Sequence, residues 1–212
     1  MFIPLVDVLR CVRPHDDTWL VASIDEAVDR DIVTGTLGCP ICRSEYPIRN
    51  GIVYFDDASA AAPPAELAAT EYEAVRAAAA LDLTDARMTA VLHGRWGACA
   101  PIMRGSTPAQ LLLVNPPNGV TSGDGVSIVR SRDVAPVARG SMAGVALGDD
   151  AAGAMLESLV ATLRPGGRVI AGVRLAVPAG LVELARDDEV WVAQREASAA
   201  ESAPVTLTRR SR

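Results

Sequence analysis

Lysine is absent from this 212-residue chain, and all of its basic side chains are arginines. A lysine nucleophile or Schiff-base amine is therefore excluded. Aromatic residues make up only 4% of the sequence, and no uninterrupted apolar run reaches the roughly 20 residues that a membrane-spanning helix needs. The signatures of a P-loop, of a G-x-S-x-G nucleophile and of an H-E-x-x-H zinc helix are missing as well.

Positive charge is also scarce. The formal net charge is −6, and the dense basic cluster of Arg209, Arg210 and Arg212 stands in what we expect to be a solvated tail. Broad binding of nucleic acid is not expected, because it needs clustered positive charge. The run MFIPLVDVLR lacks the basic region and the small-residue cleavage site of a secretory signal. These features predict a globular, cytoplasmic protein without membrane contact.

The composition changes near residue 57. Residues 1–57 contain five arginines and ten acidic residues, a charge of −5, together with five of the eight aromatic residues and three of the four cysteines. The later part is nearly neutral and rich in Ala, Val, Leu and Gly. Residues 58–64 (ASAAAPP) have the composition of a linker. We therefore predict a small domain at 1–57 and a larger one at 65–212.

Short β-rich runs dominate the first of these domains. Residues 18–22 and 31–36 read as strands, and Asn50-Gly51 between apolar runs is a hairpin signal. In the second domain, apolar runs at 89–92, 111–114, 126–129, 143–147 and 168–173 alternate with helical stretches. The helices are expected at 65–81, 151–163 and 179–186, with further strands at 190–194 and 205–208. Such alternation predicts an α/β fold with a parallel, doubly wound sheet.

Cysteine spacing indicates a metal site in the first domain. Cys39 and Cys42 form a C-x-x-C knuckle, and Cys11 with His15 can supply the other two ligands of a tetrahedral Cys₃His zinc site. Two other interpretations remain open: a metal-free relic of such a site, and a redox-active C-x-x-C. Cys99 stands apart in the second domain, where we expect a buried side chain.

The first domain resembles a known family on these residues. The run LVDVLRC at 5–11, the run CPICR at 39–43 and the run YPIRNGI at 46–52 are similar to the small zinc-ribbon proteins that bind and activate methyltransferases. The chain departs from that pattern at Pro14, where cysteine is usual, and at Asn50, where aspartate is usual. The resemblance implies a structural zinc ion and a protein partner, either a methyltransferase or a second copy of the chain.

The second domain resembles a class I S-adenosylmethionine-dependent methyltransferase. The resemblance is carried by DVAPV at 133–137, GSMAGVAL at 140–147 and LRPGGRVI at 163–170. It implies a Rossmann-like sheet, usually of seven strands with the last antiparallel. It also implies that Gly94, Gly97, Asn115 and Asp133 occupy the cofactor-binding positions.

Two of the three polar anchors of that cofactor site are altered. His93 stands where the first strand of the family ends in an acid, and Asn115 replaces the acid that accepts the ribose hydroxyls. Arg95 and Trp96 add bulk to a turn that is small in the family. We therefore expect S-adenosylmethionine binding to be strongly weakened, and a non-catalytic scaffold, subunit or activator is the leading interpretation.

Alternatives remain for the second domain. It can be a divergent methyltransferase with an unknown acceptor, or its pocket can serve another small ligand with Arg95 as an anion ligand. Asp149-Asp150 can bind an amine or a cation, or simply precede a helix N-terminus. His93 can act as a base, although the sequence identifies no carboxylate partner for it.

Overall fold

The computed structural model describes residues 1–56 and 68–196. Its first part is a short helix, η1 (Ile3–Val8), followed by four antiparallel strands: β1 (Val21–Val28), β2 (Asp31–Gly38), β3 (Glu45–Arg49) and β4 (Ile52–Tyr54). Asn50 and Gly51 link β3 to β4 with φ angles of 50° and 75°. Two successive left-handed residues define the expected tight hairpin turn, so that prediction is confirmed. The strand expected at 18–22 starts later, at Val21.

The second part contributes seven strands, which are β5 (Thr89–His93), β6 (Gln110–Val114), β7 (Val126–Arg130), β8 (Met142–Leu147), β9 (Leu163–Gly172), β10 (Leu181–Arg186) and β11 (Val190–Arg195). They lie in the order β7-β6-β5-β8-β9-β11-β10. Strands β5 to β9 pair in parallel, and β11 pairs antiparallel with β9. The predicted α/β fold with a Rossmann-like sheet is therefore confirmed.

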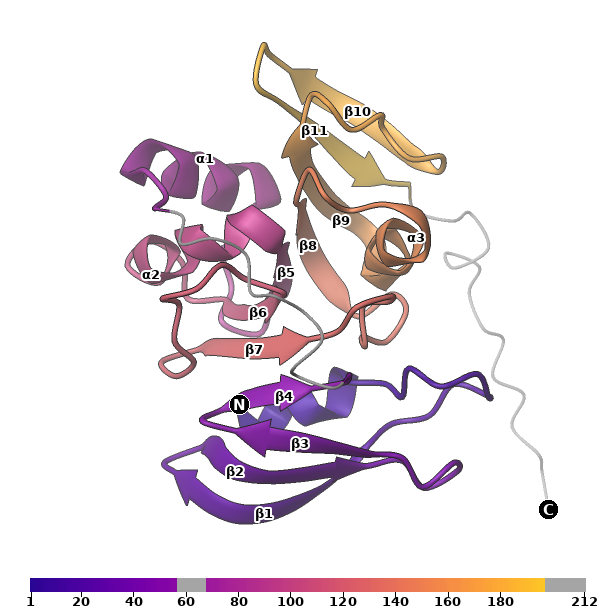
Figure 1. Ribbon diagram of the computed structural model, residues 1–212. Coiled ribbons are helices and arrows are strands. Elements are labelled where there is room, and N and C mark those ends of the chain that lie inside the picture. The colour runs from indigo at the N-terminus through magenta and orange to yellow at the C-terminus, as the bar shows by residue number, and fades with distance from the viewer. Residues whose placement is uncertain (57–67, 197–212) are drawn as a thin grey trace, which may run out of the picture.

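Helices cover both faces of this sheet. The α1 helix (Glu71–Leu81), η2 (Gly94–Cys99) and α2 (Ala100–Met103) pack on one face, and α3 (Gly153–Thr162) packs on the other, together with η1 (Figure 1). The α1 helix begins after Thr70, whose side chain and that of Glu73 form a capping box. Its predicted start at 65 lies outside the described residues, and the described residues 68–70 are not helical.

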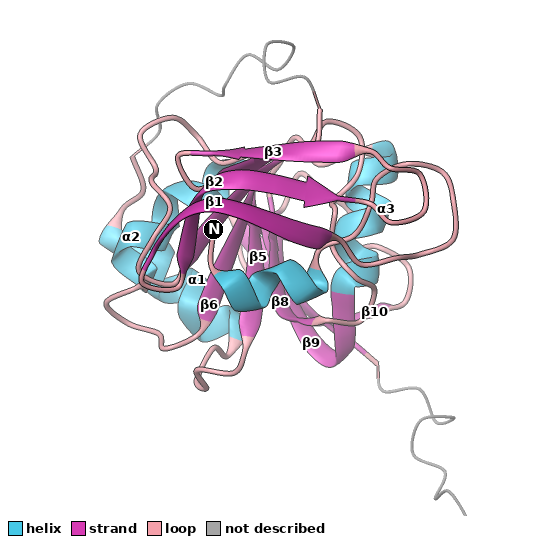
Figure 2. Cartoon of the chain, turned by 90° about the horizontal axis from the view of Figure 1, so that it is seen from below, coloured by secondary structure: helices cyan, strands magenta, loops and turns pink. Residues whose placement is uncertain are grey.

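Strands β1 to β4 with the loop of Cys11 and His15, called the ribbon below for brevity, join the Rossmann-like sheet edge to edge. Strand β4 pairs in parallel with β7, so the eleven strands of the described residues belong to one sheet with β1 and β10 at its edges. The join is also packed, because Leu9 and Val53 share one hydrophobic cluster with Val129 and Val137. The amino-terminal strands lie at the bottom of Figure 1, and Figure 2, seen from that side, shows β1, β2 and β3 in front of β5, β6 and β8. The division into two domains stays a prediction, and the expected linker at 58–64 lies outside the described residues.

One predicted helix is wrong. Within the predicted helix at 179–186, residues 179 and 180 form a turn and residues 181–186 form strand β10, which pairs antiparallel with β11 and has a bulge between Glu183 and Ala185. Leu, Ala, Glu and Arg favour a helix locally, but the hydrogen-bonding edge of β11 determines the conformation here. The strand predicted at 205–208 and the arginines at 209–212 lie outside the described residues. Within the described residues, no helix combines the length and apolarity needed to cross a membrane.

Candidate functional site

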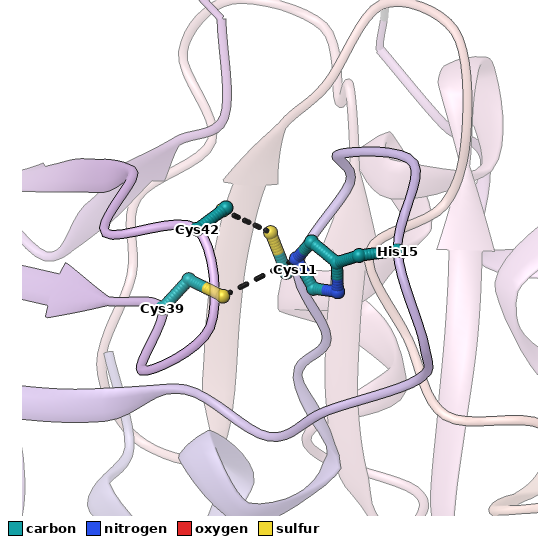
Figure 3. A group of neighbouring side chains, drawn as sticks. All are labelled: Cys11, His15, Cys39 and Cys42. Carbon is teal, nitrogen blue, oxygen red and sulfur yellow. Dashed lines mark hydrogen bonds between the residues drawn. The ribbon is translucent and has the colours of Figure 1, made fainter.

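The four predicted metal ligands come together. The ligand atoms of Cys11, His15, Cys39 and Cys42 all lie within 4.8 Å of one another. Cys11 Sγ is 3.6 Å from Cys42 Sγ, and Cys39 Sγ is 3.3 Å from His15 Nε2 (Figure 3). A tetrahedral zinc ion with Zn–S bonds of about 2.3 Å separates two sulfur ligands by about 3.8 Å. The donor set and its spacing therefore fit a single tetrahedral ion.

Backbone hydrogen bonds shape the knuckle that carries two of these thiols. The Cys39 N–H donates to the carbonyl of Ser44 at 2.9 Å, and the Arg43 N–H donates to the carbonyl of Cys39 at 3.0 Å. Arg43 has a left-handed φ of 60°. The chain thus reverses sharply after β2, which turns both sulfur atoms toward the loop that bears Cys11 and His15 (Figure 3).

Hydrogen bonds from neighbouring groups orient the ligands and shift their pKa values in different directions. Nδ1 of His15 lies 2.7 Å from the carbonyl of Asp16, which fixes a proton on Nδ1 and leaves the lone pair of Nε2 facing the sulfur atoms. This hydrogen bond also raises the pKa of His15. Hydrogen bonds with the side chain and backbone of Ser44 lower the pKa of Cys42 to about 6. The Tyr46 hydroxyl lies 3.0 Å from Cys11 Sγ and connects the cluster to the core.

At the cofactor end, protein atoms occupy the space beside both glycines. Gly94 follows β5 with a φ of +58°, and a Cβ built on it would lie 2.7 Å from Asp150 Oδ1. A Cβ on Gly97 would lie 2.5 Å from Cβ of Pro116. Between them the indole of Trp96 is buried and donates to the carbonyl of Leu147 at 2.8 Å. The turn is therefore packed against its own chain.

Asn115 and Asp133, the other two expected cofactor contacts, differ in their surroundings. The Asn115 side chain is engaged twice, because its Nδ2 donates to the carbonyl of Ser131 at 2.6 Å and its Oδ1 accepts from the Ser131 N–H at 3.0 Å. It therefore joins the end of β6 to the end of β7. Asp133 is exposed beyond β7. The structure brings Gly94 and Gly97 into one turn but gives Asn115 a structural partner.

The structure places a carboxylate near His93 that the sequence did not identify. His93 ends β5 and is buried, with Nδ1 3.7 Å from Asp150 Oδ1 and without a hydrogen bond among the described residues. Burial lowers the pKa of His93 and outweighs the attraction of Asp150. The signal for this pair was the adjacency of β5 and β8, whose carboxyl ends bear His93 and Asp149-Asp150. Neither aspartate lies in the first turn of α3, which begins at Gly153.

A cavity of about 640 Å³ opens on the other side of Trp96, at the carboxyl ends of β8 and β9. Arg95 reaches its wall but is engaged by acids, since it lies 2.8 Å from Glu73 Oε1 and 3.8 Å from Asp149 Oδ2. Arg95 is thus already paired with acids, which disfavours the alternative in which it binds an anion. Parallel α/β sheets bind ligands at this edge, next to the point where the strand order reverses.

No family model and no curated protein matches the chain. Solved structures of related fold include a geranyl diphosphate methyltransferase in complex with S-adenosylmethionine, 15% identical over 48% of each chain with a TM-score of 0.38. A tRNA (m1A58) methyltransferase from Aquifex aeolicus is 13% identical over 62% of this chain and 73% of that one, with a TM-score of 0.42. A protein from Corynebacterium glutamicum is 11% identical over 63% of this chain and 84% of that one, with a TM-score of 0.44.

The chain spans about half the length of the geranyl diphosphate methyltransferase, with 48% of that protein covered. Similarities this distant say nothing about the activity of this chain. The order and direction of strands β5 to β11 carry the fold assignment: the chain has an α/β fold with a Rossmann-like sheet, and its β-rich amino-terminal part contains a Cys/His cluster that could hold a metal ion.

Proposed function

We propose that this chain is a non-catalytic methyltransferase-like protein that acts by binding a protein partner. One observation carries the proposal: a Cβ on Gly94 would lie 2.7 Å from Asp150 Oδ1 and a Cβ on Gly97 would lie 2.5 Å from Pro116 Cβ, so the turn that approaches the cofactor in the family is packed against this chain's own side chains. Asp150 is largely exposed and can rotate away, whereas Pro116 is buried. Displacing a ring from such a close-packed contact typically costs about 1–3 kcal/mol.

Recruiting Asn115 to a cofactor ribose would add a further cost. Its two hydrogen bonds to Ser131 would break, and each polar group left without a partner costs about 1–3 kcal/mol. Two such losses weaken binding by about two to four decades. Asp133 alone does not compensate for them.

Isothermal titration with S-adenosylmethionine and S-adenosylhomocysteine tests this proposal on the whole chain. We expect no saturable heat below millimolar concentration. Binding in the micromolar range would overturn the proposal and support the alternative, a divergent methyltransferase with an unknown acceptor. In that case Asn115→Ala and Asp133→Asn should each weaken the binding, which would show that the cofactor occupies the family's site.

The partner surface that we propose is the free edge of the sheet at β1. Strand β4 already covers the edge at β7, whereas Val21, Ile24 and Val28 on β1 and the nearby Trp19 are exposed apolar side chains. An exposed apolar edge strand is a template for pairing with another chain. The partner is either a methyltransferase or a second copy of this chain.

Sedimentation at increasing protein concentration distinguishes these two partners. Self-association through β1 should be lost in Ile24→Lys but kept in Val75→Lys, a control at a similarly exposed position on α1 (45% and 47%). A chain that stays monomeric at all concentrations excludes the second copy. Equal loss in both variants would contradict a role for β1.

We also propose that Cys11, His15, Cys39 and Cys42 bind a structural zinc ion. Four protein ligands leave no open coordination position for a substrate, which is typical of structural zinc. Metal analysis of purified protein should find one zinc per chain, and Cys39→Ser should lose it. If His15→Ala kept the full zinc content, His15 would be excluded as an essential ligand.

A further inference from the structure

The cavity beside Trp96 shares Arg95 and Trp96 with the glycine turn, but neither Gly94 nor Gly97 lines it. Its walls come from the first turns of α1, from η2, from the loop after β8, from the end of β9 and from the turn between β10 and β11. Its volume of about 640 Å³ falls within the range of small-molecule sites, about 300–1,000 Å³. Val173 and Val190 contribute an apolar part of the lining.

Carboxylates outnumber guanidinium groups around this cavity. Arg76 pairs with Asp187 and Glu189, and Arg95 pairs with Glu73 and Asp149. Each guanidinium also lies near an aromatic ring, with Cζ of Arg76 5.7 Å from Tyr72 and that of Arg95 5.3 Å from Trp96. Both arginines are thus held by their neighbours, and the four acids around them leave an excess charge of −2.

The remaining charged groups of the lining do not cancel this excess. Asp188 and Arg174 add one charge of each sign, and neither has an ion pair within the described part of the chain. The lining therefore holds four acids and three arginines, and Asp187, which pairs with Arg76 from outside the lining, adds a fifth acid. An excess of negative charge between low-dielectric walls attracts a cation.

Asp149 is the carboxylate best placed to bind such a cation. Its one ion pair, to Arg95, is long at 3.8 Å, and the absence of a side chain at Gly172 leaves room for its Oδ1 at the end of β9. The next residue, Asp150, faces the buried His93, whose Nδ1 has no hydrogen bond. Within the described residues, Arg95 at 3.8 Å is therefore the one arginine that pairs with either Asp149 or Asp150.

We propose that this cavity binds a small organic cation, an aliphatic amine. Its ammonium groups lie against the Asp149 and Asp188 carboxylates, and its hydrocarbon chain lies against Val173 and Val190. None of Gly94, Gly97, Asn115 and Asp133 lines this cavity, so the inference does not rest on the function proposed above. A titration that detects no S-adenosylmethionine binding would leave the proposed amine site unchanged.

Three probes of equal length and different charge test the proposal by isothermal titration of the whole protein. They are 1,5-diaminopentane, the zwitterion 5-aminopentanoate and the dianion glutarate. We expect the diamine to bind with saturation, more weakly at high salt, and glutarate not to bind. Asp149→Asn and Asp188→Asn should each lower the affinity for the diamine about three- to tenfold.

The matched control is Asp85→Asn, an aspartate whose ion pair with Arg87 lies outside the cavity lining. It should leave the affinity for the diamine unchanged. Thermal unfolding of each variant establishes that it is folded. The proposal fails if the diamine shows no saturation at millimolar concentration, or if glutarate or 5-aminopentanoate binds as tightly. It also fails if both cavity variants bind the diamine like the unaltered protein.

Discussion

At the scale of single residues, the chain's cysteines have very different environments. Cys42 is exposed, and its hydrogen bonds with Ser44 favour the thiolate. Cys99 is buried between η2 and the sheet, and burial raises the pKa of its thiol to about 11. The thiolate is the form that reacts with alkylating agents and the form that binds metal. Cys42 is therefore suited to bind a metal, whereas Cys99 is suited to pack in the core of the sheet.

We predict that Cys42 is alkylated by iodoacetamide well before Cys99 in metal-stripped protein. With a pKa of about 6, Cys42 is mainly thiolate at pH 7, and its reaction should slow as the pH falls through 6. Cys99, with a pKa of about 11, should react only after unfolding. Peptide mass spectrometry at several pH values measures both rates. In zinc-loaded protein Cys42 should be protected, and equal rates with and without metal would contradict coordination.

At the scale of elements, the contact between η2 and the loop after β6 determines what the glycine turn can accept. Gly97 lies against the ring of Pro116, and the next ring, Pro117, is also close. Both prolines are buried. A rigid ring cannot rotate away as a flexible side chain can, so the turn and the loop hold each other in place.

We predict that Gly97→Ala destabilises the protein by about 1–3 kcal/mol, because its Cβ would lie 2.5 Å from Cβ of Pro116. Gly105→Ala is the matched control, since its Cβ would meet only the carbonyl oxygen of Ile102, at 3.4 Å. Neither glycine has a positive φ, so backbone strain does not separate the two variants. Urea unfolding measures both. Equal stabilities would show that the Pro116 contact relaxes at no cost.

At the scale of the whole molecule, the ribbon completes the larger sheet. The β4–β7 pairing supplies hydrogen bonds to an edge that would otherwise be open, and the amino-terminal segment covers the face next to it. The Arg10 N–H donates to the carbonyl of Pro136, and the Phe2 N–H donates to Ser127 Oγ, both at 2.9 Å. The segment that carries the candidate ligand Cys11 is thus tied to the packing of the sheet.

We predict that the protein unfolds in one thermal transition rather than two. Amide hydrogen exchange in β4 and β7 should then report the same free energy of opening, since the two strands share hydrogen bonds and a core. If zinc is bound, a chelator should lower the midpoint of this whole transition. Separate unfolding of the ribbon would instead support two independent domains.

Much of the fold could be read from local pattern. Continuous apolar runs predicted β5 to β8, and every residue of β8 is buried, as expected of a strand covered on both faces. The C-x-x-C knuckle, Cys11 and His15 also followed from the sequence, because few residue types bind zinc and their spacing is constrained. Stripes of apolar residues and turn residues such as Asn50-Gly51 act over a few positions, so the sequence by itself determines them.

The tertiary structure alone decided the rest. Residues 181–186 form a strand because they pair with the edge of β11. The three-residue β4 pairs with β7, which lies more than seventy positions away in the sequence. The sequence showed that the cofactor turn was altered, but it could not show that Asp150 and Pro116 occupy the space beside the glycines. It also could not bring Asp149 and Asp188 to one cavity. The physical reason is that the pairing of strands and the filling of space beside a turn depend on contacts between segments distant in sequence, and no local pattern of residues determines such contacts.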